Sequence, residues 1–550
     1  MLGTLDPMWI VRRRDGVTRP TAPLALAAAS LIALSAPNAH AQHARQGARP
    51  PDSAHAPASP AARASRDSAR TEDDSIRISE IARRPPVITH HTMQLKGATL
   101  AYTATTGMLP IRNDTTGVAE GYIFYVAYTK DGTSDPAKRP LTFVFNGGPG
   151  SSTVWLHLGA FGPRRVKLNA DGSPPAPPPT LEDNPYTLLD QTDLVFLDPV
   201  GTGYSRPSKP ALGPNFWGVT EDLRSVAEFI RLYLTRYERW LSPKFLAGES
   251  YGTTRAAGLS GVLADRGIAL NGIVLISTVL NFETLSDQKG NDLGFVGFLP
   301  SYTAIAWYHK KLPADLQRQT VEQVTAQAEQ FAGNGYTLAL ERGASLTAAQ
   351  RKAVIDTLSR FTGLSPAFID HNDLRIPLGR FDQELLRDEH QTVGRLDGRF
   401  TAYATDDGAE RGAFDPSDAD IENTFTPVLN DYVRRDLGFS DDEMYWILGG
   451  GIGRWRYPQR EGFLDVTPYL ERAFAKNPYM KLFVAMGYYD TATPYYAVEY
   501  TLDHLALSDK ARGDITTDHF GAGHMVYIDS PSMARLRQDL TAFIDSATAR

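Results

Sequence analysis

One short segment restricts the fold of this chain more than any other. Residues 245–252, Phe-Leu-Ala-Gly-Glu-Ser-Tyr-Gly, place a GxSxG pentapeptide directly after an apolar run and before a segment of helical character. A serine hydroxyl attacks a carbonyl when a base takes its proton, and a sharp turn from strand to helix lifts that oxygen clear of the sheet. Gly248 and Gly252 let neighbouring backbone approach closely. The segment therefore predicts Ser250 as a nucleophile, a hypothesis for which the rest of the chain must supply the partners.

The chain repeats a pattern in which a short buried strand ends in a glycine-rich turn. Such strands are expected at 141–145, 193–197 and 245–247, with two more at 273–276 and 481–486. Between the second and third, apolar residues recur at helical spacing: Leu223, Val226, Ala227, Ile230 and Leu234. Strands that alternate with helices predict an α/β fold with a mostly parallel central sheet flanked by helices. The aromatic and branched residues 122–128 suit a strand at the first edge of that sheet.

The amino terminus has the composition of a targeting segment. Arginines precede an apolar run at residues 22–36, and Ala39-His40-Ala41 supplies the small residues of a cleavage site. The run is shorter than the roughly 20 residues that span a bilayer, so we favour a cleaved signal over a membrane anchor and expect no stable membrane insertion. We therefore expect a signal peptide over residues 1–41, cleavage near Ala41, and a periplasmic or secreted protein.

Composition and pattern also divide the rest of the chain. The residues after the cleavage site are rich in Ala, Ser, Pro and Arg, and they hold too few large apolar side chains to order themselves. Later, a helical stretch interrupts the alternation of strands and helices, and in it Thr347 and Gln350 form a capping-box signature before a helix that Gly363 ends. We expect this stretch to roof the active site, and a purely structural excursion is the alternative. The expected parts are a disordered leader (42–80), the first part of the core (81–282), a helical cap (283–455) and the second part of the core (456–550).

Charge and residue content exclude several classes of function. The formal net charge of −7 is small for 550 residues, and the basic cluster at Arg12–Arg14 stands alone, so no nucleic-acid partner is expected. The chain has no cysteine, which excludes thiol nucleophiles and cysteine metal sites. It has no HExxH motif, and the pair His90-His91 lacks acidic residues at matched spacing. We therefore expect neither a metal site nor a cofactor.

The partners that a serine nucleophile needs follow it in the chain. An imidazole must take the serine proton and a carboxylate must orient that imidazole, and Ser, Asp, His is one of the known chain orders of such triads. Asp490 follows the strand 481–486, and His524 lies in Gly-Ala-Gly-His-Met at 521–525. Because the carboxyl ends of parallel strands share one edge of a sheet, we expect both residues to meet Ser250 there.

Three other residues compete for these roles. His519 is close to His524, but its sequence context is less typical of a loop. Asp198 also ends a strand, yet it precedes the serine, so we assign it to fixing the turn that follows. Asp503 falls in a predicted helix, where a solvated side chain is expected.

Five motifs, in order, carry a resemblance to a known family. They are Asn146-Gly-Gly-Pro-Gly-Ser-Ser152, Asn184-Pro-Tyr186, Leu197-Asp-Pro-Val-Gly-Thr-Gly-Tyr-Ser205, Gly248-Glu-Ser-Tyr-Gly252 and Gly521-Ala-Gly-His-Met525. Together they resemble the serine carboxypeptidase family, peptidase family S10. The resemblance implies an α/β hydrolase fold with an inserted helical cap. It also implies a peptide substrate, whose carboxy-terminal amino acid is released through an acyl-enzyme.

The resemblance also assigns roles to residues. It implies Ser250 as the nucleophile, His524 as general base and then acid, and Asp490 as the orienting carboxylate. It further implies an oxyanion hole made by the backbone N–H groups of Gly148 and Tyr251. Two fixed donors suit the chemistry, because loss of one such donor typically lowers the rate about 100- to 1,000-fold.

In the family, an asparagine and a glutamate bind the terminal carboxylate of the substrate, and here these are Asn146 and Glu249. A glutamate binds a carboxylate when one of the two holds a proton, which favours acidic pH. Three positions depart from the family pattern. Ala160 stands where a second glutamate is usual, Ser151 stands where a disulfide cysteine is usual, and a tryptophan near Val144 is replaced.

The sequence thus supports three functions. A serine carboxypeptidase fits the triad together with Asn146 and Glu249. An esterase or acyltransferase would keep the triad and is suggested by Ala160. A binding protein that retains the fold is the third, and occupation of every triad position argues against it. The side-chain preference of the pocket and the oligomeric state stay open.

Overall fold

The computed structural model describes residues 77–406, 408–409, 412–458 and 462–549, all of which belong to a unit that begins at Ala61. The predicted signal peptide and leader residues 42–76 lie outside the described residues. Residues 77–83 are helical, and Ile81 packs into a core of the protein. The predicted leader extends to residue 80, but residues 77–80 already belong to this helix.

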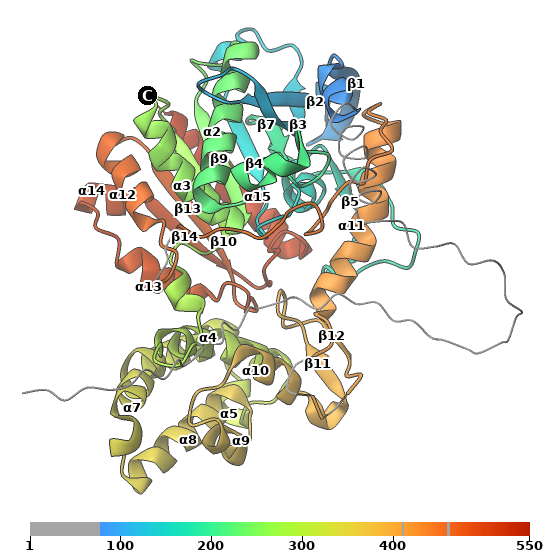
Figure 1. The fold of residues 1–550 in the computed structure, drawn as a ribbon. Coiled ribbons are helices and arrows are strands. Elements are labelled where there is room, and N and C mark those ends of the chain that lie inside the picture. Colours follow the sequence, from blue (N-terminus) through green and yellow to red (C-terminus); the bar gives the residue numbers. More distant parts are fainter. Residues whose placement is uncertain (1–76, 407, 410–411, 459–461, 550) are drawn as a thin grey trace, which may run out of the picture. The chain divides into compact units, whose positions relative to one another are not determined.

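Within the described residues, a ten-stranded mixed sheet forms the centre of the fold (Figure 1). Its order is β1-β2-β3-β7-β4-β9-β10-β13-β14, with β8 paired to β3. The strands are β1 (Val87–Leu95), β2 (Ala98–Arg112), β3 (Ala119–Lys130), β4 (Leu141–Phe145), β7 (Asp193–Leu197), β8 (Arg206–Pro207), β9 (Lys244–Ser250), β10 (Gly272–Thr278), β13 (Lys481–Gly487) and β14 (Ile515–Phe520). From β7 to β14 all neighbours are parallel, whereas β1 to β3 pair antiparallel. The mostly parallel sheet is confirmed. Residues 122–128 form part of β3 as a strand, but β3 pairs with β2 on one side and β7 on the other, so the prediction that they lie at the first edge of the sheet is wrong. The hairpin of β1 and β2 extends the sheet beyond β3.

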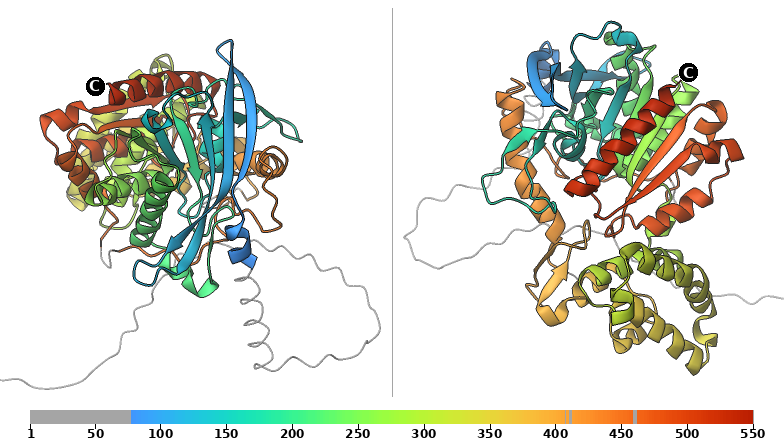
Figure 2. Two further views of the ribbon diagram at one scale, coloured as in Figure 1. Left: turned by 90° about the horizontal axis from the view of Figure 1, so that it is seen from above. Right: turned by 180° about the vertical axis from the view of Figure 1, so that it is seen from behind.

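Helices cover both faces of this sheet because its strands are apolar on both sides. In β9, Phe245 and Ala247 join one core cluster, while Leu246 joins the other, as the alternation of a strand requires. The helices on the first face are α11 (Pro416–Arg435) and α15 (Ser530–Thr548), and those on the second are α2 (Val219–Arg236), α3 (Tyr251–Asp265), α12 (Thr467–Lys476) and α13 (Tyr495–Asp503). Figure 2 shows α15 crossing the sheet on the side away from α2. This arrangement is the α/β hydrolase fold.

A helical insertion with a core of its own follows β10. Its helices are α4 (Leu293–Tyr308), α5 (Ala314–Gln317), α6 (Val321–Phe331), α7 (Thr337–Arg342), α8 (Ala348–Thr362), α9 (Pro366–His371) and α10 (Leu378–Glu384), and a hairpin of β11 (Gln391–Val393) and β12 (Thr401–Tyr403) follows. Thr347 and Gln350 make the predicted capping box of α8, and Gly363 ends it in the left-handed conformation. The apolar cluster of the insertion extends from Phe295 to Val393 and adds Tyr489 from the hydrolase core.

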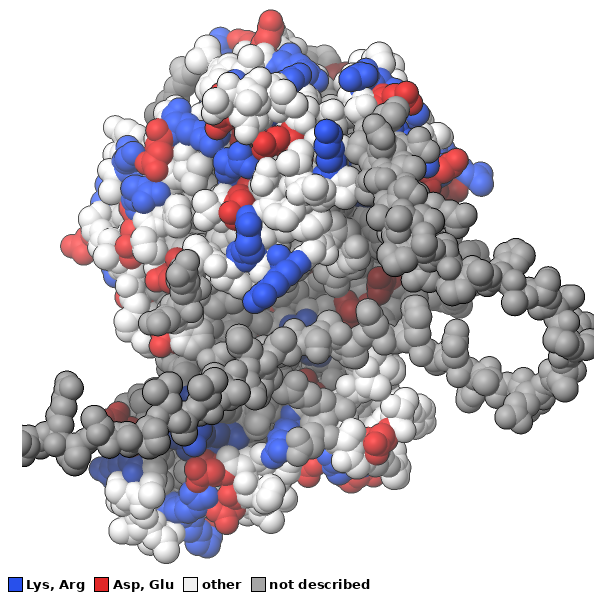
Figure 3. Space-filling model, viewed as in Figure 1, with Lys and Arg blue, Asp and Glu red and all other residues white. Residues whose placement is uncertain are grey.

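The last part of the predicted cap packs differently. On α11, Phe425, Leu429 and Tyr432 join the cluster that covers the sheet, as does Phe439 after it. The pattern of a helix shows that it has an apolar face but not which neighbour covers it, so 283–455 combines a true insertion with a helix of the core. None of the described helices is long and apolar enough to cross a membrane. On the face seen in Figure 3, acidic and basic side chains are interspersed.

Candidate active site

The serine turn has the geometry that its sequence predicts. Strand β9 ends at Ser250 and α3 begins at Tyr251, and Ser250 joins them with φ 59° and ψ −130°. A positive φ is costly for a residue with a side chain, and such strain concentrates at functional sites. The glycines make room for it, because a Cβ at Gly248 would overlap the carbonyl oxygen of Gly252 and one at Gly252 would lie 2.8 Å from the carbonyl oxygen of Phe145.

An aspartate and a histidine meet in the loops after β13 and β14. Oδ2 of Asp490 lies 2.8 Å from Nδ1 of His524. The backbone N–H groups of Ala492 and Thr493 donate to Oδ1 over 2.8 and 2.9 Å, and the Thr493 hydroxyl donates to Oδ2 over 2.6 Å. Asp490 is fully buried and His524 is nearly so. The carboxylate is thus held in place and directs Nδ1 of the imidazole toward itself, which leaves Nε2 for another partner.

The charge state of His524 reflects two opposed effects. Burial disfavours the imidazolium, but the carboxylates of Asp490 and Glu249 favour it more, so the pKa of His524 lies above its ordinary value. An imidazole placed in this way is well suited to accept a proton from a hydroxyl.

Residues 395–397 of the predicted cap hold both loops. The carbonyl oxygen of Leu396 accepts a 2.6 Å hydrogen bond from the backbone N–H of His524, and that of Arg395 accepts from Thr491. Oδ2 of Asp397 accepts from the backbone N–H of Gly523 over 3.0 Å. These residues of the predicted cap therefore help to position the imidazole.

A pocket of about 300 Å³ contains Ser250 and His524. Its other lining residues on the hydrolase core include Asn146, Gly147, Gly148, Trp155, Glu249, Tyr251, Thr493 and Met525. The predicted cap contributes Leu285, Arg395, Leu396, Asp418, Ile421 and Leu448. The expectation that the cap helps to shape the pocket agrees with this lining, although α4 to α10 provide none of it among the described residues.

The glycine-rich turn lies against the serine turn. A Cβ at Gly147 would overlap the backbone nitrogen of Tyr251 and lie 2.8 Å from the carbonyl oxygen of Glu249. Gly148 adopts φ +100°, which favours glycine. Tyr251 is the first residue of α3, so its N–H has no partner within the helix. The two predicted oxyanion donors thus belong to backbone segments in close contact.

Asn146 and Glu249 line the same pocket and are almost completely buried. Oδ1 of Asn146 accepts from the backbone N–H of Leu156 over 3.1 Å. Among the described residues, Nδ2 of Asn146 and Oε2 of Glu249 have no hydrogen-bond partner. Burial raises the pKa of Glu249 to about 7, with Asp490 adding to the rise and His524 and nearby hydrogen-bonding groups opposing it. At neutral pH, Glu249 therefore holds a proton in about half of the molecules, and at mildly acidic pH in most of them.

The three competing residues lie elsewhere. His519 on β14 pairs with Glu499 at 3.1 Å. Asp198 is buried and accepts from the backbone of Thr153 and the hydroxyl of Tyr445, a structural role of the kind expected for it. Asp503 is exposed at the end of α13.

Several residues at the site were not predicted. Thr493 follows Asp490 by three positions, and an aspartate with a threonine at this spacing is a recognisable turn signal. Residues 395–397 carry no such signal, because they reach the site only through the fold. Tyr527, three positions after His524, is buried, and its hydroxyl has no hydrogen-bond partner in the part of the chain that the structure describes.

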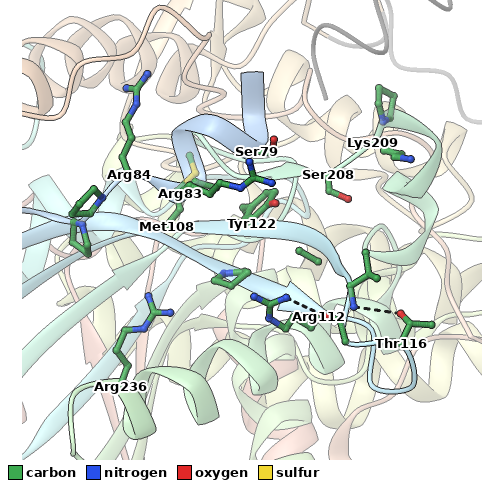
Figure 4. Close-up of a pocket in the computed structure, with 18 of the residues that line it drawn as sticks. Ser79, Arg83, Arg84, Met108, Arg112, Thr116, Tyr122, Ser208, Lys209 and Arg236 are labelled. Atoms are coloured by element: carbon green, nitrogen blue, oxygen red, sulfur yellow. Dashed lines mark hydrogen bonds between the residues drawn. The ribbon is translucent and has the colours of Figure 1, made fainter. Parts of the chain in front are cut away.

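A larger cavity, of about 1230 Å³, lies between the helix at 77–83, the β2–β3 loop and residues 208–211 (Figure 4). Its charged lining residues, as far as the structure describes them, are all basic: Arg83, Arg84, Arg112, Lys209 and Arg236. None of the predicted catalytic or binding residues lines it. In the described part of the chain, no cluster of three His, Asp or Glu residues could hold a metal ion.

Comparison with known proteins finds relatives of this chain. Over 192 residues the chain is 30% identical to serine carboxypeptidase-like 34 of Arabidopsis thaliana, which covers 32% of this chain and 35% of that relative. Serine carboxypeptidase-like 36 of the same plant is 30% identical over 195 residues, 34% of this chain and 37% of the relative. The aligned parts thus span about a third of the length of these curated relatives.

Among solved structures, the yeast prohormone-processing carboxypeptidase Kex1(Δ)p superposes with a TM-score of 0.49 at 15% identity, over 80% of this chain and 91% of that one. The model of the serine carboxypeptidase family, peptidase S10, matches residues 99–518, which is most of the chain. The chain therefore belongs to the serine carboxypeptidase family.

Proposed function

We propose that this protein is a serine carboxypeptidase that hydrolyses the carboxy-terminal peptide bond of peptides through an acyl-enzyme. The observation that carries the proposal is a single pocket that holds the Ser250 turn, the imidazole bound to Asp490, and the buried pair Asn146 and Glu249. Ser250, His524 and Asp490 would carry out acyl transfer, and Asn146 and Glu249 would recognise the free carboxylate of the substrate.

In the proposed reaction, Nε2 of His524 takes the proton of the Ser250 hydroxyl as Oγ bonds to the scissile carbonyl carbon. The negative oxygen of the tetrahedral intermediate accepts from the N–H groups of Gly148 and Tyr251. The C–N bond then breaks, and His524 gives its proton to the leaving amino group. Water attacks the acyl-enzyme by the same route and restores the serine, while Asp490 stabilises the imidazolium in both halves.

The terminal carboxylate of the substrate is bound by two donors in this proposal. Nδ2 of Asn146 carries N–H groups without a hydrogen-bond partner among the described residues, and Glu249 holds a proton in most molecules below pH 7 because burial raises its pKa to about 7. Both groups are neutral, so they bind the carboxylate without repelling it. Cleavage is thereby restricted to the end of a peptide.

An esterase or acyltransferase is the second candidate, and Ala160 favours it. This buried methyl group stands where the family usually has a glutamate, so the site offers fewer carboxyl groups to the substrate. Turnover of small esters without release of amino acids from peptides would support this candidate.

The decisive assay compares an amino-blocked dipeptide with its carboxy-terminal amide and ester. We expect faster cleavage of the free acid, and equal rates for acid and amide would contradict a carboxylate site. Ser250→Ala should abolish turnover and labelling by an organophosphonate. His524→Ala should also abolish turnover, whereas His519→Ala, the matched control, should retain it.

We further propose that the protein is exported after cleavage near Ala41, on the strength of the apolar run and the small residues that follow it. Amino-terminal sequencing of the protein from the periplasm or medium should begin near Gln42. An unprocessed amino terminus would contradict this proposal.

A further inference from the structure

Near the catalytic groups, three buried polar atoms have no hydrogen-bond partner among the residues that the structure describes. They are Nδ2 of Asn146, Oε2 of Glu249 and the hydroxyl of Tyr527, and the side chains are 1%, 3% and 0% exposed. Buried polar groups normally have hydrogen-bond partners. Several unpaired ones in one place therefore indicate that they bind a ligand or interact with each other. The three are close enough that Asn146 and Tyr527 both act on the ionisation of Glu249, although no pair reaches ordinary hydrogen-bond geometry.

Tyr527 fills the space beside the missing glutamate. It lies in the loop between β14 and α15, and its ring packs on Gly159 in the helical turn η2 (Leu156–Phe161). A Cβ at Gly159 would lie 2.6 Å from Cε2 of the ring, so only glycine leaves the ring its place. The next residue is Ala160, which carries a methyl group where the family usually has a carboxyl.

We propose that Tyr527 is a positioning residue for the substrate carboxylate, and that its hydroxyl supports Glu249 in place of the missing glutamate. The inference rests on the proposed function of the site. Asn146 and Glu249 line the pocket, whereas Tyr527 is not among its lining residues. Tyr527 therefore acts on the substrate through Glu249.

A phenol in this place differs from a carboxyl because it stays neutral. Burial, and the nearby carboxyl of Glu249, keep the pKa of Tyr527 well above its ordinary value. Ala160 and Tyr527 therefore place a methyl group and a neutral phenol, and no carboxylate of their own, near Glu249. Among the groups that face Glu249, His524 and the donors on Asn146 and Tyr527 favour its ionised form, whereas Asp490 disfavours it. Two further charged residues, Arg395 and Asp418, line the same pocket.

Tyr527→Phe tests the inference, because it removes the hydroxyl and keeps the ring against Gly159. For an amino-blocked dipeptide with a free carboxyl, measured at about pH 5 where Glu249 is protonated with or without this hydroxyl, we expect KM to rise about three- to tenfold, the effect of one lost hydrogen bond, with kcat nearly unchanged. The carboxy-terminal amide should be cleaved as by the wild type.

A pH profile separates positioning from a general structural effect. Without the Tyr527 hydroxyl, the ionised form of Glu249 is less favoured, so the pKa of Glu249 rises. The pH at which the preference for the free acid is lost should therefore increase by about half to one unit. Because the hydroxyl has no hydrogen-bond partner among the described residues, its removal should not lower the melting temperature.

Tyr432→Phe is the matched control. This tyrosine belongs to the same buried cluster, but its hydroxyl is paired with that of Tyr128 at 2.9 Å. Its loss should lower the melting temperature and leave the ratio of acid to amide cleavage and its pH dependence unchanged.

The possible failures are distinguishable. If Tyr527→Phe leaves KM and the pH profile as in the wild type, or slows acid and amide cleavage equally, the role of Tyr527 is refuted while the carboxypeptidase proposal stands. If the wild type itself shows no preference for the free acid, or Ser250→Ala retains activity, the proposed function fails first.

Discussion

Raising the pH through neutrality should remove the preference of this protein for substrates with a free carboxyl group. Burial raises the pKa of Glu249 to about 7, so about ten in eleven molecules hold the proton at pH 6 and about one in eleven at pH 8. Only the protonated form donates to a carboxylate. We therefore expect kcat/KM for the free acid, relative to the amide, to fall about tenfold between these two values of pH.

Parallel measurement of the two substrates isolates this effect. An amino-blocked dipeptide and its amide both need the triad, so the titration of His524 cancels in the ratio of their kcat/KM values. The glutamine of Glu249→Gln cannot ionise, so the ratio of kcat/KM for the acid to that for the amide should not change with pH in this variant. A wild-type ratio that is constant from pH 6 to 8, or an equal decline in Glu249→Gln, would refute the reasoning.

The same residue should affect stability with a defined sign. Because the pKa of Glu249 is raised in the folded protein, its stabilising contribution is complete below the unfolded value of 4.5 and is lost as the pH rises through about 7. The difference corresponds to about 3 kcal/mol. Denaturant unfolding should thus show Glu249→Gln to be more stable than the wild type at pH 8, by up to that amount, and to gain little at pH 4.5.

Three further substitutions test the triad, the oxyanion hole and a buried ion pair of the hydrolase core. Asp490→Asn should lower kcat about 10,000-fold with little change in KM, because the imidazole loses its orienting carboxylate. Gly147→Ala should lower kcat on ester substrates about 100-fold or more, because the added Cβ overlaps the backbone nitrogen of Tyr251, a proposed oxyanion donor. Arg255→Met should destabilise the protein by about 3 to 5 kcal/mol in urea unfolding, because it leaves buried Asp222 without its partner at 2.7 Å.

Each of these has a control. Asp503→Asn removes an exposed carboxyl and should leave kcat unchanged. A Cβ at Gly513 would meet no neighbouring atom within 4 Å, so Gly513→Ala should keep full activity. Arg435→Met breaks an exposed ion pair with Asp431 and should change stability by at most about 0.5 kcal/mol. Similar effects in a test variant and its control would contradict the corresponding prediction.

Much of the fold could be predicted because its signals are local. The strands expected at 141–145 and 193–197 have these bounds in β4 and β7, and Thr347 and Gln350 cap α8 as their spacing predicts. Such features depend on the period of apolar residues and on the chemistry of single turns, which neighbouring residues determine. The candidate triad could be predicted for a related reason, since strand ends share one edge of a parallel sheet.

Contacts between distant parts of the chain depended on tertiary packing. The hydrogen bond from His524 to Leu396 and the packing of α11 on the sheet cannot be predicted from neighbouring residues in the sequence. An apolar face or a carbonyl group can pair with many partners, so local sequence does not select one. The sequence by itself determined the strand–turn–helix at Ser250 and the order of the groups that follow. Only the tertiary structure brought Tyr527, Gly159 and Glu249 together, because burial and close packing select which side chains, hundreds of positions apart, occupy one space.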